Sequence, residues 1–426
     1  MASTDEAQSA RTSRFGNSTR MLTALRYPQF RRFWLGNLAA VSGQQIMWVA
    51  QGWLVYQLTE SPVYLGYVGL ATALPAIVLN LAGGVMADRL DQRKVILTTQ
   101  IITAATVFTL ATLTMLDVVE VWQVLVVAFT SGCMQAFNNP ARQSIFPSLV
   151  ERKDLMNAVA LNSMVWQGTR IVAPATGGAI IAVFGVSTGL YVCAIGFLVL
   201  GLAVIGLPAP QKRERPAGAS IFGELGVGLA FIRSNFIFTF LIGMSFFNSF
   251  FGFSVNQMMP VFARDILHVG SWGQGIMLST TGAGAMLGIL AIGYLGDTER
   301  KGLLIIGGAA AFGTFIILFA VSTFFPFSLV ALFLMGGFGS IYMITVQTSL
   351  QMRVPDELRG RVMGIYGVTH NLGPLGAMQA GLLASTFSAP VALSVGGGAI
   401  ILFALGIAYS RREVRGLQAA PVGAAA

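Results

Sequence analysis

The sequence predicts an all-α membrane protein in which twelve transmembrane helices form two similar six-helix halves. The composition, the recurring apolar runs and the placement of positive charge support this prediction. Of the 426 residues, 55% are hydrophobic and only 10% are charged, whereas a soluble domain carries about 25% charged residues. Apolar runs of about 20 residues, the length that a membrane-crossing helix needs, recur along almost the whole chain. The alternating pattern of barrel strands is absent, so we expect these runs to be helices.

Six predicted spans lie in each half of the chain. They cover 33–58, 62–87, 95–116, 121–139, 155–182 and 186–207, and then 236–262, 271–296, 302–324, 327–347, 361–387 and 391–409. We therefore expect a tail (1–32), an N-terminal half (33–207), a linker (208–235), a C-terminal half (236–409) and a second tail (410–426). Apolar residues recur at helical spacing in the linker between Ile221 and Ile232, which predicts a short helix on the membrane surface.

Positive charge predicts the orientation of the chain. The two tails and the loops after even-numbered spans hold 24 of the 26 lysines and arginines. Because such residues stay on the cytoplasmic side during insertion, we expect both termini in the cytoplasm and the spans in the cytoplasmic (inner) membrane. The two exceptions are Arg264, at the outer end of the seventh span, and Arg170, inside the fifth.

The composition also limits the classes of molecule that the protein is expected to bind. Despite a net charge of +9, the basic residues are scattered over short loops, which argues against nucleic acid. Cys133 and Cys193 lie inside apolar spans, and the two histidines lack metal-ligand spacing, so we expect no disulfide, metal or cofactor. The expected partners are the lipid bilayer and a small-molecule substrate, and the expected state is a monomer.

The two halves resemble each other when the sequence is shifted by 209 residues without gaps. Identical pairs include Gly66 with Gly275, Thr72 with Thr281, and Asp88 with Asp297. Six spans per half mean that both halves enter the membrane from the same side. A parallel duplication with a site between its halves is typical of a transporter.

A motif after the second span resembles the signature between helices two and three of the major facilitator superfamily. It contains a glycine, an Asp-Arg pair and a trailing basic pair, and the second half repeats it in reduced form. The resemblance implies a cytoplasmic gate in which Asp88 lies against the start of the eleventh span and Asp297 against the start of the fifth, near Asn157. An aspartate in such a place accepts hydrogen bonds from a helix N-terminus. The expected gate residues are Gly84, Asp88, Arg89, Arg93, Lys94, Gly293, Asp297, Arg359 and Arg361. A role for these charges in topology alone stays open.

The fifth span is similar to an element that marks exporters in this superfamily. It carries Pro174, Gly177 and Gly178, with Ala173 in place of the first glycine. The eleventh span contains a shorter version of the same element at Pro374. Proline removes a backbone donor and small residues allow close packing, so these positions are expected to let the helices flex. Ordinary helix packing is the alternative.

Two further stretches, 139–158 and 354–362, look like the branch of the superfamily that contains macrolide-efflux proteins and the enterobactin exporter. That resemblance extends from the first span to the twelfth. It implies export without naming the cargo.

Amide side chains predict where a cavity lies. Spans one, four, five, seven, ten and eleven hold nearly all of them, and spans six, nine and twelve hold none. A lipid-facing helix cannot solvate amides, so the amide-rich spans should face one another or water. All 17 aspartates and glutamates lie in tails, loops or helix ends, which leaves Arg170 and the titratable His370 as charged candidates inside the membrane. The expected cavity residues are Gln44, Trp48, Gln51, Asn138, Asn162, Arg170, Asn248, Asn256 and His370.

These patterns together predict a secondary active transporter. The favoured function is an alternating-access exporter of amphipathic or anionic small molecules, of the drug or siderophore class, driven by the proton gradient through His370 or Asp88. Two alternatives stay open: an uptake carrier for a small solute, and a membrane-embedded enzyme that modifies lipid. A channel is disfavoured because no charged ring or filter-like repeat occurs.

Overall fold

The computed structural model describes residues 22–207, 221–296, 300–410 and 414, and this part of the chain forms helices without a strand. The N-terminal half contains α2 (Pro28–Thr59), α3 (Pro62–Arg89), α4 (Gln92–Met115), α5 (Val121–Ile145), α6 (Leu155–Phe184) and α7 (Val186–Ala203). The C-terminal half contains α9 (Phe236–Phe247), η4 (Asn248–Gly252), α10 (Phe253–Val261), η5 (Phe262–Ile266), α11 (Gly270–Leu295), α12 (Lys301–Ala320), α13 (Phe325–Arg353), α14 (Asp356–His370), α15 (Gly373–Thr386) and α16 (Ala389–Ser410). Shorter elements are η1 (Leu22–Arg26), η2 (Phe146–Leu149) and η3 (Arg152–Asp154), and α8 (Ile221–Ser234) precedes the C-terminal half. The predicted all-helical class is confirmed.

Each predicted span coincides with one helix or with a run of consecutive helices. Among the described residues, eight helical segments are long and apolar enough to cross a membrane. The others are α2, α5 and α6, which carry amides, and α14 and α15, each of which is shorter than 18 residues. Lower hydropathy is expected of helices that face a polar interior instead of lipid. The number twelve itself stays a prediction.

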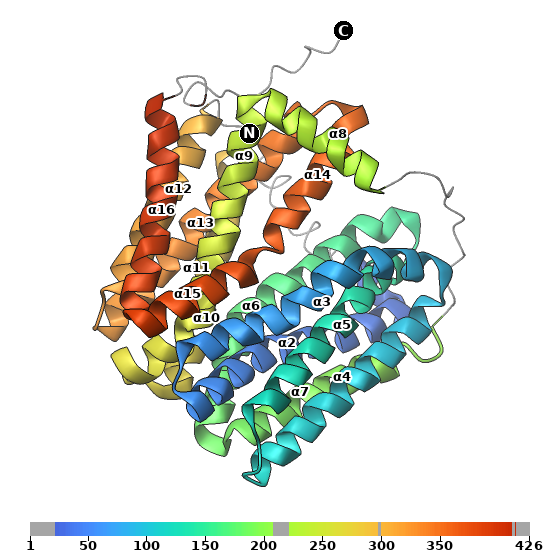
Figure 1. The fold of residues 1–426 in the computed structure, drawn as a ribbon. Coiled ribbons are helices and arrows are strands. Elements are labelled where there is room, and N and C mark those ends of the chain that lie inside the picture. Colours follow the sequence, from blue (N-terminus) through green and yellow to red (C-terminus); the bar gives the residue numbers. More distant parts are fainter. Residues whose placement is uncertain (1–21, 208–220, 297–299, 411–413, 415–426) are drawn as a thin grey trace, which may run out of the picture.

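The two halves are separate helix bundles that touch mainly through two helix pairs. Within the N-terminal half α2 packs on α6 and α7, and within the C-terminal half α11 and α12 pack on α13. Between the halves, α6 packs on α11 and α3 packs on α15. In Figure 1 the helices of the N-terminal half run obliquely to those of the C-terminal half, so the halves meet near α10 and α15 and diverge toward α8. We call the side of the α3–α4, α5–α6 and α13–α14 loops the basic end, and the side of the α2–α3 and η5–α11 loops the far end.

Two spans of the C-terminal half are irregular, and they pack against each other. The seventh contains two five-residue π-helical turns, η4 and η5. The eleventh is interrupted between His370 and Gly373, where Pro374 occupies the first turn of α15. A proline lacks the N–H that an uninterrupted helix would use there. The turn η4 contacts α15, and wide π turns are frequent at functional sites.

Glycines set how closely the two halves approach along α6 and α11. A Cβ atom added at Gly178 would lie 2.5 Å from the carbonyl oxygen of Ser271, and one added at Gly275 would lie 2.3 Å from that of Pro174. Both distances are shorter than any ordinary carbon–oxygen contact. The interface therefore requires the absence of side chains at these two positions.

We expect Gly178→Ala to lower the melting temperature of the purified protein. The added methyl group has no room between two backbones, and overpacking of this kind costs about 1–3 kcal/mol. Gly168→Ala on the same helix is the matched control, because a Cβ there meets nothing within 4 Å. Equal melting temperatures for the two variants would contradict the packing that we describe.

Candidate transport cavity

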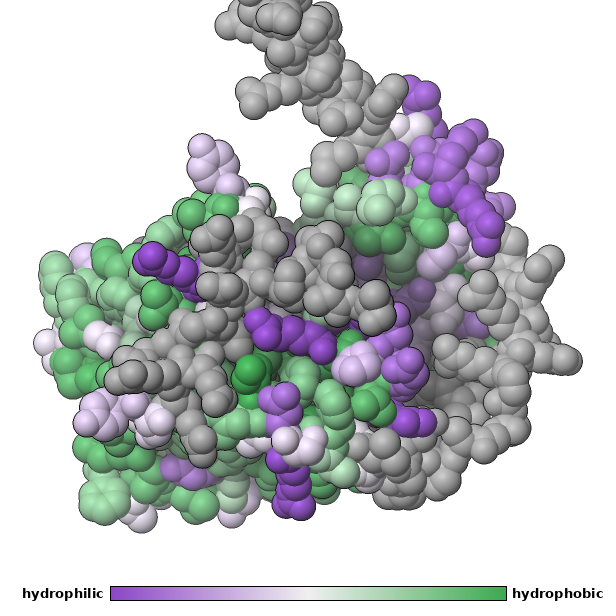
Figure 2. Space-filling model, turned by 90° about the horizontal axis from the view of Figure 1, so that it is seen from above, coloured by the Kyte–Doolittle hydropathy of each residue, from purple (hydrophilic) through white to green (hydrophobic). Residues whose placement is uncertain are grey.

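A cavity of about 450 Å³ lies between the two halves. Its lining comes from α2, α3, α5 and α6 on one side and from α10, α11 and α15 on the other. None of its described lining residues belongs to α4, α7, α12 or α16, which are the third, sixth, ninth and twelfth spans. Seen from above, Figure 2 shows a hollow with hydrophilic residues beside it and a mostly hydrophobic flank on the left of the view. The volume suits a small molecule.

Arg170 is the one charged side chain among the described residues that line this cavity. It belongs to α6, and its side chain is exposed to the cavity. No hydrogen bond or ion pair joins it to another described residue. Trp166 and Gln167 precede it by four and three positions, so all three share one face of the helix. A cation without a counter-charge in a membrane interior favours an anionic ligand.

Amides supply most of the other polar groups of the lining. They are Gln45, Gln51, Gln135, Gln167, Asn256, Gln257 and Gln274. Two of them bind the opposite half: Gln257 donates to the carbonyl oxygen of Leu65 at 2.7 Å, and Gln274 to that of Val49 at 3.5 Å. The buried amide nitrogens of Gln51 and Gln135 have no acceptor among the described residues. Buried donors are almost always satisfied. We therefore expect a solute or water to bind Gln51 from the cavity and to bind Gln135 from the cavity or from the smaller pocket that it also lines.

The cavity also offers apolar surface. Trp48, Trp166 and Phe253 line it, and Trp48 is 49% exposed. Aromatic rings beside amides and one guanidinium match a solute that is partly apolar and partly charged.

The predicted cavity residues divide into three groups in the structure. Trp48, Gln51, Arg170 and Asn256 line the cavity. Gln44 and Asn138 line a separate, smaller pocket inside the N-terminal half. The remaining described residues are Asn162, which accepts a hydrogen bond from Asn37 at 3.1 Å, and Asn248, which begins η4. The side chain of His370 lies outside the described part of the chain.

The predicted cytoplasmic gate is described only in part. The surroundings of Gly84, the side chains of Asp88 and Arg89, and the whole of Asp297 lie outside what the structure describes. The contact between Asp88 and the eleventh span therefore stays a prediction. Gly293 and Lys94 are exposed, and Arg361 lies beside Gly228 of α8, whose added Cβ would be 3.1 Å from the Cβ of Arg361.

Two gate arginines have local partners. Arg359 pairs with Asp356 at 2.5 Å within the first turn of α14. Arg93 pairs with Asp91 at 2.6 Å and donates to the carbonyl oxygen of Leu207. Hydrogen bonds from Arg93 hold the pKa of the Asp91 carboxyl below its usual range, since they stabilise the charged form. Arg93 thus ties the start of α4 to the chain after α7.

The residues of α6 that were predicted to let the helix flex lie where it contacts other helices. The helix α6 continues through Pro174, and Ala175 N–H donates to Ser279 Oγ of α11 at 2.9 Å. Gly177 faces Ile46, and Gly178 faces α11. Their role in flexing stays a prediction.

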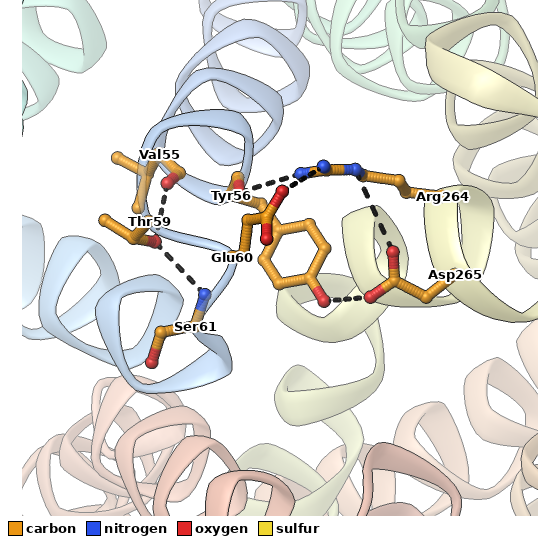
Figure 3. Close-up of polar contacts among 7 residues, drawn as sticks. All are labelled: Val55, Tyr56, Thr59, Glu60, Ser61, Arg264 and Asp265. Atoms are coloured by element: carbon orange, nitrogen blue, oxygen red, sulfur yellow. Dashed lines mark hydrogen bonds and ion pairs between the residues drawn. The ribbon is translucent and has the colours of Figure 1, made fainter.

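Sequence reasoning missed a polar cluster that joins the halves at the far end. We call Tyr56, Glu60, Arg264 and Asp265 the far-end cluster (Figure 3). Tyr56 OH donates to Asp265 Oδ2, and Arg264 pairs with Glu60 and donates to the carbonyl oxygen of Tyr56 at 3.3 Å. The Arg264 guanidinium also lies 5.7 Å from the centre of the Tyr56 ring. These contacts hold the ends of α2 and η5 together.

The 209-residue shift between the two halves offered a sequence signal for the contact between Tyr56 and Asp265. Tyr56 and Asp265 are separated by 209 residues, which is the shift that aligns the two halves. Residues related by that shift occupy equivalent places in the halves. Where such residues touch, they lie at the axis that relates one half to the other.

Arg142 was also missed, because Pro140 and the polar residues beside it resemble the end of a helix. The sequence count placed Arg142 in the loop after the fourth span. In the structure α5 continues to Ile145, so Arg142 lies within the helix and lines the smaller pocket. Arg170 is therefore not the only arginine inside a described spanning helix.

Two similar helical halves around a polar central cavity define a secondary transporter. A family model described as transmembrane secretion effector matches residues 19–424. The chain therefore belongs to this family of the major facilitator superfamily, whose members are transporters and not enzymes. The predicted superfamily is confirmed, and the lipid-modifying enzyme considered above is excluded.

Curated relatives and solved structures agree with this assignment. Macrolide efflux protein A of Streptococcus pyogenes is 25% identical over 367 residues, which cover 84% of this chain and 89% of that protein. The enterobactin exporter EntS of Citrobacter koseri is 24% identical over 404 residues, covering 93% and 94%. A mutant of the nucleoside transporter NupG has a TM-score of 0.74 at 15% identity, covering 89% of this chain and 99% of its own. A bacterial homolog of the human lysosomal transporter Spinster, inward-facing and unoccupied, has a TM-score of 0.70 at 13% identity, covering 93% and 99%.

We expect Tyr56→Phe and Asp265→Asn to loosen the far end. Tyr56→Phe removes a hydrogen bond to a charged group, and Asp265→Asn replaces the charged acceptor of that bond with a neutral one. A hydrogen bond to a charged group is worth about 1.5–3 kcal/mol, so the population of states open at this end should rise about ten-fold or more. Spin labels at Val118 and Val321, both exposed at the far end, report the separation of the halves by pulsed electron resonance. The labels are placed in a chain without Cys133 and Cys193, and a longer distance component should appear.

The control for this measurement is Lys153→Gln. It breaks an exposed ion pair with Glu151, of 2.7 Å, at the basic end. Identical distance distributions in Tyr56→Phe, Asp265→Asn and the control would show that the far-end cluster does not hold the halves together.

Proposed function

We propose that the protein is an alternating-access exporter of amphipathic, negatively charged small molecules, of the drug or siderophore class. The observation that carries this proposal is Arg170, a cavity-facing guanidinium with no described counter-charge, beside aromatic rings and unpartnered amide donors. A carboxylate, phosphate or catecholate group would satisfy both the charge and the donors. The printed names of the two curated relatives, an efflux protein and an exporter, support the direction.

The orientation that we propose places the basic end and both termini in the cytoplasm, as the positive charges indicate. The far-end cluster then lies on the outer side. Its hydrogen bonds, together with the α3–α15 and α6–α11 contacts, support a state closed toward the outside and open toward the cytoplasm. Such a state receives cargo from the cytoplasm.

Transport would follow from rocking of the two halves about the cavity. Opening requires the far-end cluster to break. Closure on the cytoplasmic side would bring Asp88 against the start of α14, and Asp297 against the start of α6. The two ends would thus be held by different polar contacts in the two states.

The driving force that we propose is the proton gradient. No described residue that lines the cavity is an aspartate or glutamate. The proton carriers that we propose are therefore Asp88 and His370, two titratable residues whose side chains lie outside the described part of the chain. We also propose that the protein functions as a monomer, which the position of the cavity between two halves of one chain supports.

Arg170→Gln should reduce efflux of anionic dyes about ten-fold while leaving efflux of neutral or cationic dyes nearly unchanged. Loss of one charge-assisted hydrogen bond, about 1.5–3 kcal/mol, accounts for that magnitude. Efflux from cells that express each variant at equal membrane levels is the measurement, and Arg170→Lys should retain part of the activity. The control is Arg233→Gln, which removes an exposed positive charge from α8, outside the cavity. An equal loss for all dyes would argue against recognition of anions by Arg170.

Asp88→Asn should slow efflux of every cargo, because it removes the proposed contact with α14 and not a contact with the solute. Asp117→Asn, at an exposed far-end turn, is the matched control. A protonophore should abolish wild-type efflux. Dye accumulation in expressing cells, in place of efflux, would favour an uptake carrier and overturn the proposed direction.

A further inference from the structure

The smaller pocket of the N-terminal half is distinct from the transport cavity. Its volume is about 30 Å³, and it lies among α2, α4, α5, α6 and α7. Its polar lining includes Arg142, Gln44, Gln100, Gln135, Asn138 and Trp166. Gln100 and Asn138 are 6% and 5% exposed, so this polar space is enclosed by the bundle.

Arg142 is held in a fixed position at this pocket. Its two terminal nitrogens donate to Asn37 Oδ1 at 3.0 Å and to Asn139 Oδ1 at 3.1 Å. Asn37 in turn donates to Asn162 Oδ1 of α6 at 3.1 Å. The guanidinium carbon also lies 5.6 Å from the centre of the Trp166 ring. Helices α2, α5 and α6 thus fix the guanidinium together.

The charge of Arg142 has no counterpart among the described residues. No described aspartate or glutamate lies within ion-pair distance, and its two hydrogen-bond acceptors are neutral amides. A guanidinium has five N–H groups, of which two are used in these contacts. A cation enclosed by protein needs a compensating negative charge, which neutral amide oxygens do not provide.

Two other donors at the pocket also lack partners. The buried amide nitrogens of Gln44 and Gln135 have no acceptor within the described part of the chain. The third unpartnered atom of the lining is Gln100 Oε1, an acceptor. The unpartnered buried atoms of the lining are thus two neutral donors and one acceptor, and they lie beside the uncompensated charge of Arg142. Positive charge with free donors favours an anion as the occupant.

We propose that this pocket binds a small monovalent anion, either a halide ion or the carboxylate group of an organic solute. A space of about 30 Å³ exceeds the 10–15 Å³ that a single water molecule requires. It is far too small for a whole drug-sized molecule, which needs several hundred Å³. Arg142 supplies the charge, and Gln44 and Gln135 supply neutral donors.

The site borders the transport cavity, since Trp166 and Gln135 line both spaces. An anion in the pocket would neutralise Arg142 without occupying the place of the cargo beside Arg170. The proposal does not depend on the direction of transport or on the coupling ion.

Quenching of Trp166 fluorescence by iodide tests the site. Iodide quenches indole on contact, and of the six tryptophans only Trp166 lines the pocket. The purified full-length protein is titrated at constant ionic strength against potassium sulfate. We expect a saturable component of quenching in the wild type that is absent in Trp166→Phe, where the reporter is removed.

Two arginine variants locate the bound iodide. Arg142→Gln should weaken the saturable component about ten-fold or more, as loss of a charge-assisted contact predicts. Arg170→Gln removes the guanidinium four residues after Trp166, in the cavity that Trp166 also lines, so it should remove only quenching that does not depend on Arg142. The component that Arg142→Gln weakens should remain. Retention in Arg142→Gln with loss in Arg170→Gln would place the anion in the transport cavity and overturn the proposal. The absence of any saturable component in the wild type would overturn it as well.

A third variant keeps the test decisive if Arg142→Gln does not fold. Gln44→Leu leaves every described contact of Arg142 in place and removes one unpartnered donor, so it should weaken iodide binding several-fold. Wild-type binding in Gln44→Leu would then overturn the proposal.

Competition of chloride or acetate with iodide distinguishes a halide ion from the carboxylate of an organic solute as the ligand of the pocket. Displacement of iodide by chloride but not by acetate assigns the pocket to halides. Displacement by both shows that it accepts the carboxylate of an organic solute. If neither anion displaces iodide, neither a chloride ion nor a carboxylate occupies the pocket, and the proposal is overturned.

Discussion

Hydrocarbon offers no hydrogen bonds, and the arrangement of this protein depends on that constraint. Every amide and guanidinium in a spanning helix has to find a partner inside the protein or face water. The helices that carry these groups consequently turn toward one another, and the third, sixth, ninth and twelfth spans contribute no described residue to the cavity. The same constraint accounts for the polar character of the surface between the halves. Gln257 and Gln274 bind carbonyl oxygens of the opposite half there, and in the transport cycle that we propose they would exchange these acceptors for water.

The all-helical class and the helix positions were predictable from the sequence, because a run of about 20 apolar residues can satisfy its backbone hydrogen bonds in a membrane by forming a helix. The superfamily was predictable from the motif after the second span. The sequence also placed four of the residues that line the cavity, because polar groups in a spanning helix face the protein interior or water and not lipid. They are Trp48, Gln51, Arg170 and Asn256. The errors arose where local sequence is ambiguous. Pro140 resembles a helix end, so Arg142 was assigned to a loop, although α5 continues through the proline to Ile145.

Other features depend on contacts that a single helix does not encode. Gln44 and Asn138 were expected in the central cavity, but the rotation of α2 and α5 within the bundle turns them into the smaller pocket. Hydrophobic periodicity could not reveal this rotation, because these helices carry polar residues on more than one face. The far-end cluster required knowledge of how the end of α2 meets the end of η5, which only the assembled halves provide. The break before α15 was suggested by Pro374, but the π-helical turns of the seventh span have no comparable sequence signal.

The contact between Tyr56 and Asp265 has an evolutionary meaning. In a dimer of identical six-helix subunits, the residue at this place would have faced a copy of itself across the symmetry axis. Two aspartates there would repel each other, and two tyrosines would lack the charged acceptor. A phenol that donates to a carboxylate is possible only when the two copies differ. Because one chain carries both halves, each half can hold a different residue at this place, and the hydrogen bond between Tyr56 and Asp265 depends on that difference.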